Sequence, residues 1–254
     1  MFCDMRGFTQ MSETMEPAQL QALLNSVFSR LTDLIRSNRG TIDKYMGDCV
    51  MAFWGAPVDT PDHASLAVKT ALEMAEAIQI LNDEHKASGL PQIGIGIGLN
   101  TGTMCVGDMG SDIRRSYTVI GDSVNLGSRL EGLSKIYGVD VVVSETTRKL
   151  ASDFVWQELD KVRVKGKDNA VAIFRPLAPI GQVDEARNAE LKIWSLALKT
   201  YRMQDWDQCD VQLLNLQRLN AKKYLYQLYT ERVISMKLLP FDPEWDGATT
   251  FQTK

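Results

Sequence analysis

The sequence has few residues of the kinds that build common metal and triad sites. It contains 2 His and 4 Cys among 254 residues, and no two cysteines are spaced as in a CxxC zinc motif. A catalytic triad based on histidine and a structural zinc site are therefore both disfavoured. We expect the four cysteines to be buried, reduced thiols, as is typical of a cytoplasmic protein.

Long apolar runs and an excess of positive charge are also missing. No segment approaches the roughly 20 apolar residues that cross a bilayer, and the first residues, MFCDMRGF, lack the features of a secretory signal. The 28 Lys and Arg against 32 Asp and Glu give a formal charge of −4. We therefore expect no nucleic-acid partner, and a phosphorylated ligand would need a metal ion or a few placed cations.

What is present is the composition of a folded protein, with 44% hydrophobic and 24% charged residues. The length fits one large domain with a small appendage. A change in composition after the segment RPLAPIGQ predicts a main domain over residues 1–180 and a C-terminal helical extension over 181–254. From Asp184 onward, apolar residues recur at helical spacing, so we expect this extension to be helical and free of strands.

The main domain alternates between helical and strand patterns. Apolar spacing predicts a helix from Pro17 to the stop at 38–40, and a second from near Asp62 to Ala87. A β-hairpin is expected between them, and alternating glycine and isoleucine predict a strand after the second helix. A strand, a turn and a helix follow over 117–138. The order predicts an α+β fold with a ferredoxin-like βαββαβ core and extra α/β elements.

Two aspartates and one loop are candidates for chemistry. Asp4 and Asp48 each stand at an apolar strand, where an uncompensated charge is costly. The first and third strands of a ferredoxin-like sheet are neighbours, so both carboxylates can converge on one point and hold Mg²⁺ together with substrate phosphates. The segment Gly7, Phe8 and Thr9 is expected to be a loop whose backbone amides approach an anion.

Four segments together resemble one family. FCDMRGFT, DKYMGDCVMAFWG, YTVIGDSVNLGSRLE and VRVKGK are similar, in this order, to the successive signatures of the class III nucleotidyl cyclase catalytic domain. The resemblance covers roughly the first 175 residues. Thr118 makes it similar to the bacterial subgroup, often termed class IIIb, that pairs lysine with threonine. The implied activity is that of an adenylate cyclase, which converts ATP to 3′,5′-cyclic AMP and pyrophosphate.

The resemblance assigns a role to each matching residue. It implies that Asp4 and Asp48 bind two Mg²⁺ or Mn²⁺ ions per active site, and that Lys44 and Thr118 recognise the adenine base and so favour ATP over GTP. Asn125 orients the ribose and Arg129 stabilises the transferring phosphate. The implied substrate-binding residues further include the terminal-phosphate lysine and the phosphate loop: Lys165, Gly7, Phe8 and Thr9.

The resemblance also implies an assembly. The family works as a head-to-tail dimer in which one subunit supplies Asp4 and Asp48 and the other supplies the remaining residues, so a homodimer would hold two sites. Gly96 stands at the position where some members carry an arginine for phosphate contact. Only three residues precede Asp4, so we expect a further region upstream of Met1. We expect a cytoplasmic catalytic domain, with membrane attachment, if there is any, only through that region.

A second function is kept as an alternative. A catalytically silent cyclase-like module that dimerises and binds nucleotide would share the fold, although it has no chemical need for both aspartates and Arg129. A diguanylate cyclase shares the ferredoxin-like core, but it needs a GGDEF-like turn in the hairpin. This sequence has YMGDC there, which excludes that class.

Overall fold

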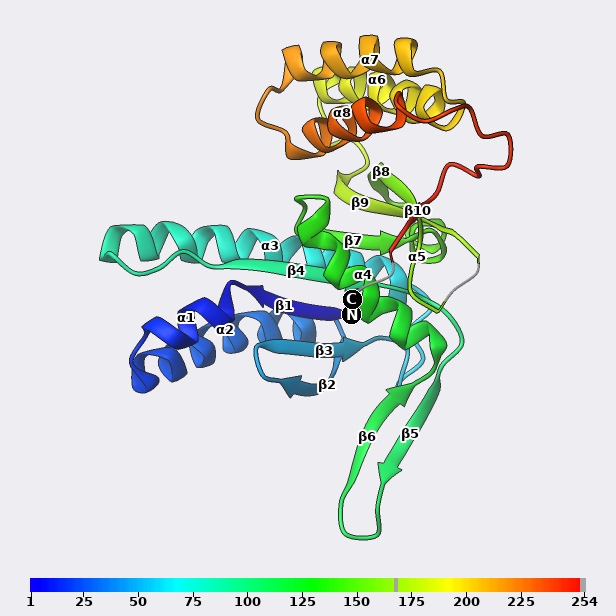
Figure 1. The fold of residues 1–254 in the computed structure, drawn as a ribbon. Helices are drawn as coiled ribbons and strands as arrows, with labels where there is room; N and C mark the ends of the chain where they lie inside the picture. Colours follow the sequence, from blue (N-terminus) through cyan, green and yellow to red (C-terminus); the bar gives the residue numbers. More distant parts are fainter. Residues whose placement is uncertain (167–168, 252–254) are drawn as a thin grey trace. The chain divides into compact units, whose positions relative to one another are not determined.

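The structure is a computed structural model that describes residues 1–166 and 169–251. The chain divides into two compact units, whose elements are labelled in Figure 1. The first unit contains residues 1–135 and 139–153, and the second contains residues 136–138 and the chain from residue 154 onward. The predicted domain boundary at residue 180 lies within the second unit, because the strands before it group with the C-terminal helices. The assignment of residues 1–180 to one domain stays a prediction.

The strands of the first unit have the predicted ferredoxin-like order. They run β7-β4-β1-β3-β2, with β1 antiparallel to both of its neighbours and β4 parallel to β7. Within this order, β4-β1-β3-β2 is the ferredoxin-like arrangement, and the prediction that the first and third strands are neighbours is confirmed. The bounds are β1 (Phe2–Arg6), β2 (Thr41–Met46), β3 (Cys49–Phe53), β4 (Gly94–Leu99) and β7 (Val141–Ser144).

Two long helices connect these strands, as the apolar spacing predicts. Helix α2 (Pro17–Ser37) has proline in its first turn, where the missing N–H costs nothing. Helix α3 (His63–Ser88) ends at Gly89, whose φ of 68° suits the left-handed position after a helix. Buried apolar side chains lie along one face of each helix, among them Val27, Leu31, Ile35, Ala67, Val68, Ala71, Met74 and Ile78.

Helix α4 (Asp122–Ile136) lies on β4 because β4 has glycine at alternate positions. A Cβ atom added at Gly98 would meet the Gly127 carbonyl oxygen of α4 at 2.3 Å, and one added at Gly96 would meet the Ser134 hydroxyl at 2.3 Å. The isoleucines that alternate with these glycines are buried and point to the opposite face of the sheet. The glycines of β4 therefore allow α4 to pack closely on one face of the sheet, and the isoleucines fill the core on the other face. Helix α5 (Glu145–Leu150) follows β7.

A two-stranded ribbon is a separate sheet of the first unit. Strands β5 (Cys105–Gly110) and β6 (Arg115–Ile120) pair only with each other in the described part of the chain, and Figure 1 shows the ribbon projecting away from the larger sheet. Cys105 on β5 is exposed, so the expectation that all four thiols are buried is wrong at this residue.

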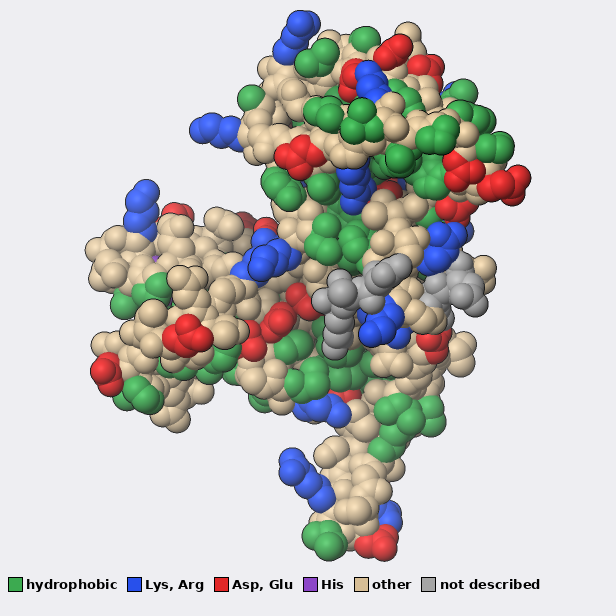
Figure 2. Space-filling view, viewed as in Figure 1, with side chains coloured by type: hydrophobic (Ala, Val, Ile, Leu, Met, Phe, Trp, Pro, Cys, Tyr) green, Lys and Arg blue, Asp and Glu red, His purple; other side chains and the backbone are tan. Residues whose placement is uncertain are grey.

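The second unit combines strands with helices. It contains β8 (Phe154–Arg163), β9 (Val171–Pro179), α6 (Glu185–Arg202), α7 (Trp206–Leu219), α8 (Tyr224–Met236) and β10 (Thr249–Thr250). An aromatic core forms between α6 and α8, where Trp194 packs against Tyr226 and Tyr229 at ring-centroid distances of 5.3 and 4.9 Å. Figure 2 shows apolar side chains gathered over these helices.

The prediction that the C-terminal extension is free of strands is wrong. Residues Thr249–Thr250 form β10, which pairs in parallel with β8. Side chains hold this segment in place: Thr249 Oγ1 donates to Asp160 Oδ2 at 2.8 Å, and Arg163 Nη2 pairs with Asp246 Oδ2 at 2.9 Å. A strand of two residues is too short to show an apolar periodicity in the sequence, and it is extended because it pairs with β8.

No helix in residues 1–166 and 169–251 has the length and apolar character needed to cross a membrane. Lysine and arginine side chains are scattered over the visible face rather than gathered into one basic patch (Figure 2).

Candidate active site

Asp4 and Asp48 come together at the pairing of β1 and β3. Asp4 lies opposite Cys49 in the antiparallel register, and Asp48 precedes Cys49 in the hairpin turn with Gly47. Gly47 has a φ of 66°, which lets the turn close tightly. The prediction that the two carboxylates converge is therefore confirmed by the strand pairing.

The carboxyl group of Asp4 is perturbed by its burial and by Asp48. Burial, followed by the charge of Asp48 and a hydrogen bond between the two side chains, raises the pKa of Asp4 from 3.8 to about 6. Burial, followed by the charges of Asp4 and Glu131, raises the pKa of the Cys49 thiol to about 12. The thiol is therefore not a nucleophile at neutral pH, and the chemistry available here is that of the carboxylates.

The surroundings of Asp4 fit a cation. Asp4 Oδ1 is buried and has no hydrogen-bond partner, and neither Asp4 nor Asp48 forms an ion pair within the described residues. Those residues contain no cluster of three or more metal-ligating side chains. A site with two carboxylates suits Mg²⁺, which is commonly held by one or two carboxylates together with substrate phosphates.

The predicted loop over Gly7, Phe8 and Thr9 is wrong in its conformation. Gly7 has a φ of 73° and turns the chain from β1 directly into helix α1 (Phe8–Thr14), whose first turn closes through Met11 N–H to Gly7 O at 3.0 Å. Sequence periodicity missed α1 because the helix buries no residue. Binding of an anion by Gly7, Phe8 and Thr9 stays a prediction, now with a helix N-terminus in place of a loop.

Lys44 and Thr118 both contact Asp43, a residue that the sequence patterns did not indicate as part of the site. The side chain of Asp43, on β2, is fully buried, with Oδ1 at 3.1 Å from Lys44 Nζ. Its Oδ2 accepts hydrogen bonds from Thr118 Oγ1 at 2.5 Å and from the Val119 N–H at 3.2 Å. The carboxylate thus links Lys44 on β2 with Thr118 on β6.

Asp43 was missed because its burial depends on an irregularity in β2. The register to β3 shifts between Ile42 and Lys44, so Asp43 is the extra residue of a β-bulge. A bulge breaks the alternation of buried and exposed side chains on which strand predictions depend. The signal in the sequence was an aspartate within a strand, which requires a compensating partner when it is buried.

Asn125 and Arg129 lie one turn apart on α4, as predicted. Asn125 is exposed in the first turn, where its N–H bonds to Gly121 O at 3.2 Å. Arg129 is half-buried, and its Nη1 is a buried donor without a hydrogen-bond partner in the described structure. A guanidinium group with an unused buried donor is suited to bind an anionic ligand.

Gly96 has a packing role. Its missing side chain leaves room for Ser134 and Glu131 of α4, whose oxygen atoms would lie 2.3 and 2.7 Å from a Cβ atom. A larger side chain at this position would require the side chains of Ser134 and Glu131 to move aside. Gly96 therefore reflects the close approach of the helix.

Lys165 belongs to the second unit, where it is exposed in the turn that follows β8. Its neighbours in sequence, Lys161 and Arg163, pair with Asp246 at 3.3 and 2.9 Å. Basic residues stand at alternate positions 161, 163, 165 and 167 of the sequence, and Lys167 lies outside the described residues. The role of Lys165 in phosphate binding stays a prediction.

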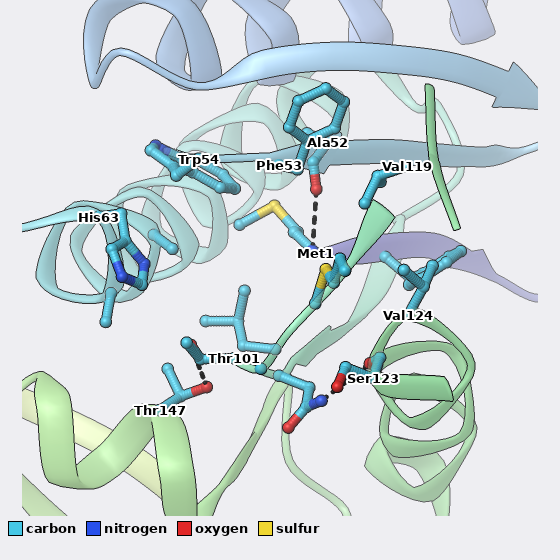
Figure 3. Close-up of a pocket in the computed structure, with 18 of the residues that line it drawn as sticks. Met1, Ala52, Phe53, Trp54, His63, Thr101, Val119, Ser123, Val124 and Thr147 are labelled. Atoms are coloured by element: carbon cyan, nitrogen blue, oxygen red, sulfur yellow. Dashed lines mark hydrogen bonds between the residues drawn. The ribbon is translucent and has the colours of Figure 1, made fainter. Parts of the chain in front are cut away.

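One pocket of the first unit is lined by none of the predicted site residues. Figure 3 shows this cavity of about 90 Å³, in which Met1 N donates to Ala52 O at 2.9 Å and Thr101 contacts Thr147 at 2.9 Å. Its described lining is mostly apolar and has no lysine or arginine. It therefore does not suit a triphosphate.

Comparison with known proteins agrees with the fold. Residues 1–174 match the family described as "Adenylate and Guanylate cyclase catalytic domain". An adenylate cyclase of Anabaena cylindrica is 39% identical over 182 residues, which are 68% of this chain and 35% of that protein. The chain belongs to the family of adenylate and guanylate cyclase catalytic domains, and the predicted resemblance is confirmed. It spans about a third of the length of the Anabaena relative.

Solved structures show the same likeness. The crystal structure of the adenylyl cyclase CyaB from P. aeruginosa has a TM-score of 0.66 and 33% sequence identity, and the match covers 72% of this chain and 94% of that one. The crystal structure of the guanylyl cyclase Cya2 has a TM-score of 0.64 and 34% identity, over 72% of this chain and 92% of that one. Because one structure is an adenylyl cyclase and the other a guanylyl cyclase, overall structural similarity does not distinguish ATP from GTP as the substrate.

Proposed function

We propose that this domain is an adenylyl cyclase that converts ATP to 3′,5′-cyclic AMP and pyrophosphate. The observation that carries the proposal is the pair of carboxylates, Asp4 and Asp48, which touch without a compensating cation among the described residues of a cyclase-family domain. Such a pair destabilises the fold unless a cation binds it. We therefore infer that Asp4 and Asp48 hold divalent cations together with the nucleotide.

The reaction is an in-line displacement at phosphorus. The ribose 3′-oxygen forms a bond to the α-phosphorus, the bond to the bridging oxygen breaks, and pyrophosphate leaves with the electron pair. Two Mg²⁺ or Mn²⁺ ions, when bound by the two aspartates, would activate the 3′-hydroxyl and neutralise the triphosphate. Arg129 supplies a permanent positive charge to the transferring phosphate, Asn125 orients the ribose, and the hydroxyl proton passes to a substrate phosphate or to solvent.

Lys44 and Thr118 select the base in this proposal. The Lys44 ammonium donates to adenine N1, and the Thr118 hydroxyl accepts from the N6 amino group. Guanine has a donor at N1 and an acceptor at C6, so both groups would face a mismatched partner. Lys44 is half-exposed, so its ammonium group can contact a ligand while it pairs with Asp43, and Thr118 contacts the same carboxylate.

We further propose that the active site is shared between two copies of the chain. Among the described residues, each half has a buried polar atom without a hydrogen-bond partner, which is Asp4 Oδ1 in one half and Arg129 Nη1 in the other. A head-to-tail homodimer would place the nucleotide and its metal ions between these groups. Lys165 from the second unit would then contact the terminal phosphates.

The direct test is formation of cyclic AMP from ATP by the purified chain with Mn²⁺. We expect product that depends on protein and on divalent metal, and none from the Asp4→Ala variant. Absence of product at high protein concentration, from a chain shown to be folded and dimeric, would overturn the enzyme proposal. It would favour the silent nucleotide-binding module, which binds ATP without turning it over.

A further inference from the structure

Asp43 is a buried charge that touches both base-selecting residues. Its side chain is fully buried, its Oδ1 lies 3.1 Å from Lys44 Nζ, and its Oδ2 lies 2.5 Å from Thr118 Oγ1. Oδ1 makes no hydrogen bond within the described structure, so the Lys44 ammonium is the group that compensates its charge. The buried carboxylate of Asp43 therefore contacts both of the residues that are proposed to bind the base.

The contact fixes the direction of the Thr118 hydroxyl. A threonine hydroxyl has one hydrogen and can donate or accept, whereas a carboxylate can only accept. The Thr118 hydrogen must therefore point to Asp43 Oδ2, which leaves only lone pairs to face the base. A hydroxyl without this constraint could rotate and donate to the C6 oxygen of guanine.

The same carboxylate fixes the other member of the pair. Lys44 can only donate, and its attraction to Asp43 holds the ammonium group next to Thr118. The two residues then present one donor beside one acceptor. This pattern complements N1 and N6 of adenine and opposes N1 and O6 of guanine.

We propose that Asp43 is a specificity-determining positioning residue, which makes Thr118 an obligatory acceptor and Lys44 a fixed donor and so sets the preference for ATP over GTP. The inference rests on the proposed cyclase function. It differs from a purely structural role, in which Asp43 would only tie β2 to β6 through the Val119 N–H. A structural role predicts equal losses with both nucleotides.

The Asp43→Asn variant tests the proposal with almost no change in shape. An amide must direct its NH₂ group either at Lys44, which displaces the lysine, or at Thr118, which frees the hydroxyl hydrogen. Either arrangement destroys the donor–acceptor pattern. We expect the ratio of kcat/KM for ATP to that for GTP to fall by about tenfold or more, since mismatched polar groups in a binding site discriminate by at least this much.

A double-mutant cycle separates positioning from structure. In a Thr118→Val background there is no hydroxyl to orient, so Asp43→Asn should change the nucleotide ratio much less than it does in the wild type. Asp108→Asn is the matched control, because Asp108 is an exposed aspartate on β5 of the same ribbon. It should leave the ratio unchanged.

The outcomes distinguish this inference from the proposed function. No cyclic nucleotide from the wild type overturns the cyclase proposal itself. An active wild type with an unchanged ratio in Asp43→Asn, or equal changes in both Thr118 backgrounds, overturns the role of Asp43. Asp43→Ser is the second variant and should also lower the ratio. If neither variant folds, as judged by thermal unfolding, Asp43 acts on stability and the inference fails.

Discussion

Asp4 and Asp48 share a hydrogen bond although they lie 44 residues apart, because the pairing of β1 with β3 places Asp4 opposite the residue that follows Asp48. Two carboxylates at this distance repel each other whenever both are ionised. Without metal, the arrangement lowers the free energy of unfolding of the protein. The effect can be measured by replacing either aspartate.

Asparagine at either position should stabilise the protein without metal. The folded-state pKa of Asp4, raised by burial and by Asp48 to about 6, means that stability is lost as the pH rises from about 4 through 6. At pH 8 in EDTA we expect Asp4→Asn and Asp48→Asn to raise the free energy of unfolding by about 1 kcal/mol, a value reduced because water still screens the half-buried group. Thermal unfolding with chelator measures it.

Addition of Mn²⁺ should reverse this order. The wild type gains stability by binding the ion, whereas each asparagine variant lacks one ligand and gains less. Asp108→Asn, on the exposed ribbon, serves as the control and should follow the wild type with and without metal. Equal gains for all four proteins would contradict metal binding by Asp4 and Asp48.

Mixing two inactive variants should restore activity if the site is shared. Asp4→Ala and Arg129→Ala homodimers are each expected to be inactive. Their heterodimer would have one intact site, so an equimolar mixture at equilibrium should recover about a quarter of the wild-type activity, since half of the dimers are mixed and each has one site of two. Cyclic AMP formation measures recovery.

Subunit exchange has to be shown in the same sample, for example with differently tagged chains. Exchange without recovered activity would contradict the shared site. A mixture of Asp4→Ala with Asp48→Ala is the negative control, because both changes affect the same half of the site and the heterodimer has no intact site.

The close contact of α4 with β4 should be sensitive to one methyl group. In Gly98→Ala the new Cβ would lie 2.3 Å from two backbone atoms of α4, Gly127 O and Glu131 N. The helix must move, which should cost about 2 kcal/mol or more of stability. Because α4 carries Asn125 and Arg129, we also expect kcat to fall sharply.

Gly132→Ala provides the matched comparison on the same helix. An added Cβ there meets nothing within 4 Å, and alanine is favoured over glycine in a helix interior by about 1 kcal/mol. We expect Gly132→Ala to stabilise the protein. Thermal unfolding and kcat of the two variants together test whether packing on β4, rather than the loss of a glycine, positions α4. Equal effects would contradict this account.

The second unit should show an acid-dependent stability from Glu190. Burial opposes ionisation, but hydrogen bonds from Tyr226 and Arg187 and the charge of Lys223 outweigh it and lower the pKa of Glu190 from 4.5 to about 2. Lys223 is protonated throughout this range, since burial lowers its pKa only to about 7. The stabilisation by Glu190 is thus present above pH 4.5 and lost as the pH falls towards 2.

Glu190→Gln should therefore flatten the acid side of the stability curve. We expect the difference in the free energy of unfolding between the wild type and Glu190→Gln to shrink as the pH falls below 4.5. The change is at most about 1.4 kcal/mol per pH unit, as for one titrating group. Chemical denaturation from pH 5 to 2.5 measures the slope, and Glu244→Gln, at an exposed carboxyl group, is the control. An unchanged slope in Glu190→Gln would show that the carboxylate is not stabilised by its partners.

Much of the first unit could be predicted because its signals are local. Pro17 and Gly89 mark where α2 begins and α3 ends, and the alternating glycine and isoleucine mark β4. The order of these elements restricts the fold to few topologies. Once β1 and β3 are neighbours, the convergence of Asp4 and Asp48 follows from chain geometry alone.

Other features depend on contacts between distant residues. Thr249 and Thr250 form a strand only because β8 offers an edge, and helix α1 buries no apolar face that a pattern could show. In the sequence, Gly96 stands where some family members have an arginine that contacts phosphate. In the structure, the side chains of Ser134 and Glu131 on α4 occupy the space next to Gly96.

The sequence by itself determined the order of the elements, the family and the residue types of the site, because capping residues, apolar periods and motifs act over a few positions. Only the tertiary structure decided which groups touch. The bulge in β2 that buries Asp43 beneath Lys44 and Thr118 is the clearest case. Its carboxylate is stable there because β6, 75 residues away, supplies donors, and no local pattern can carry that information.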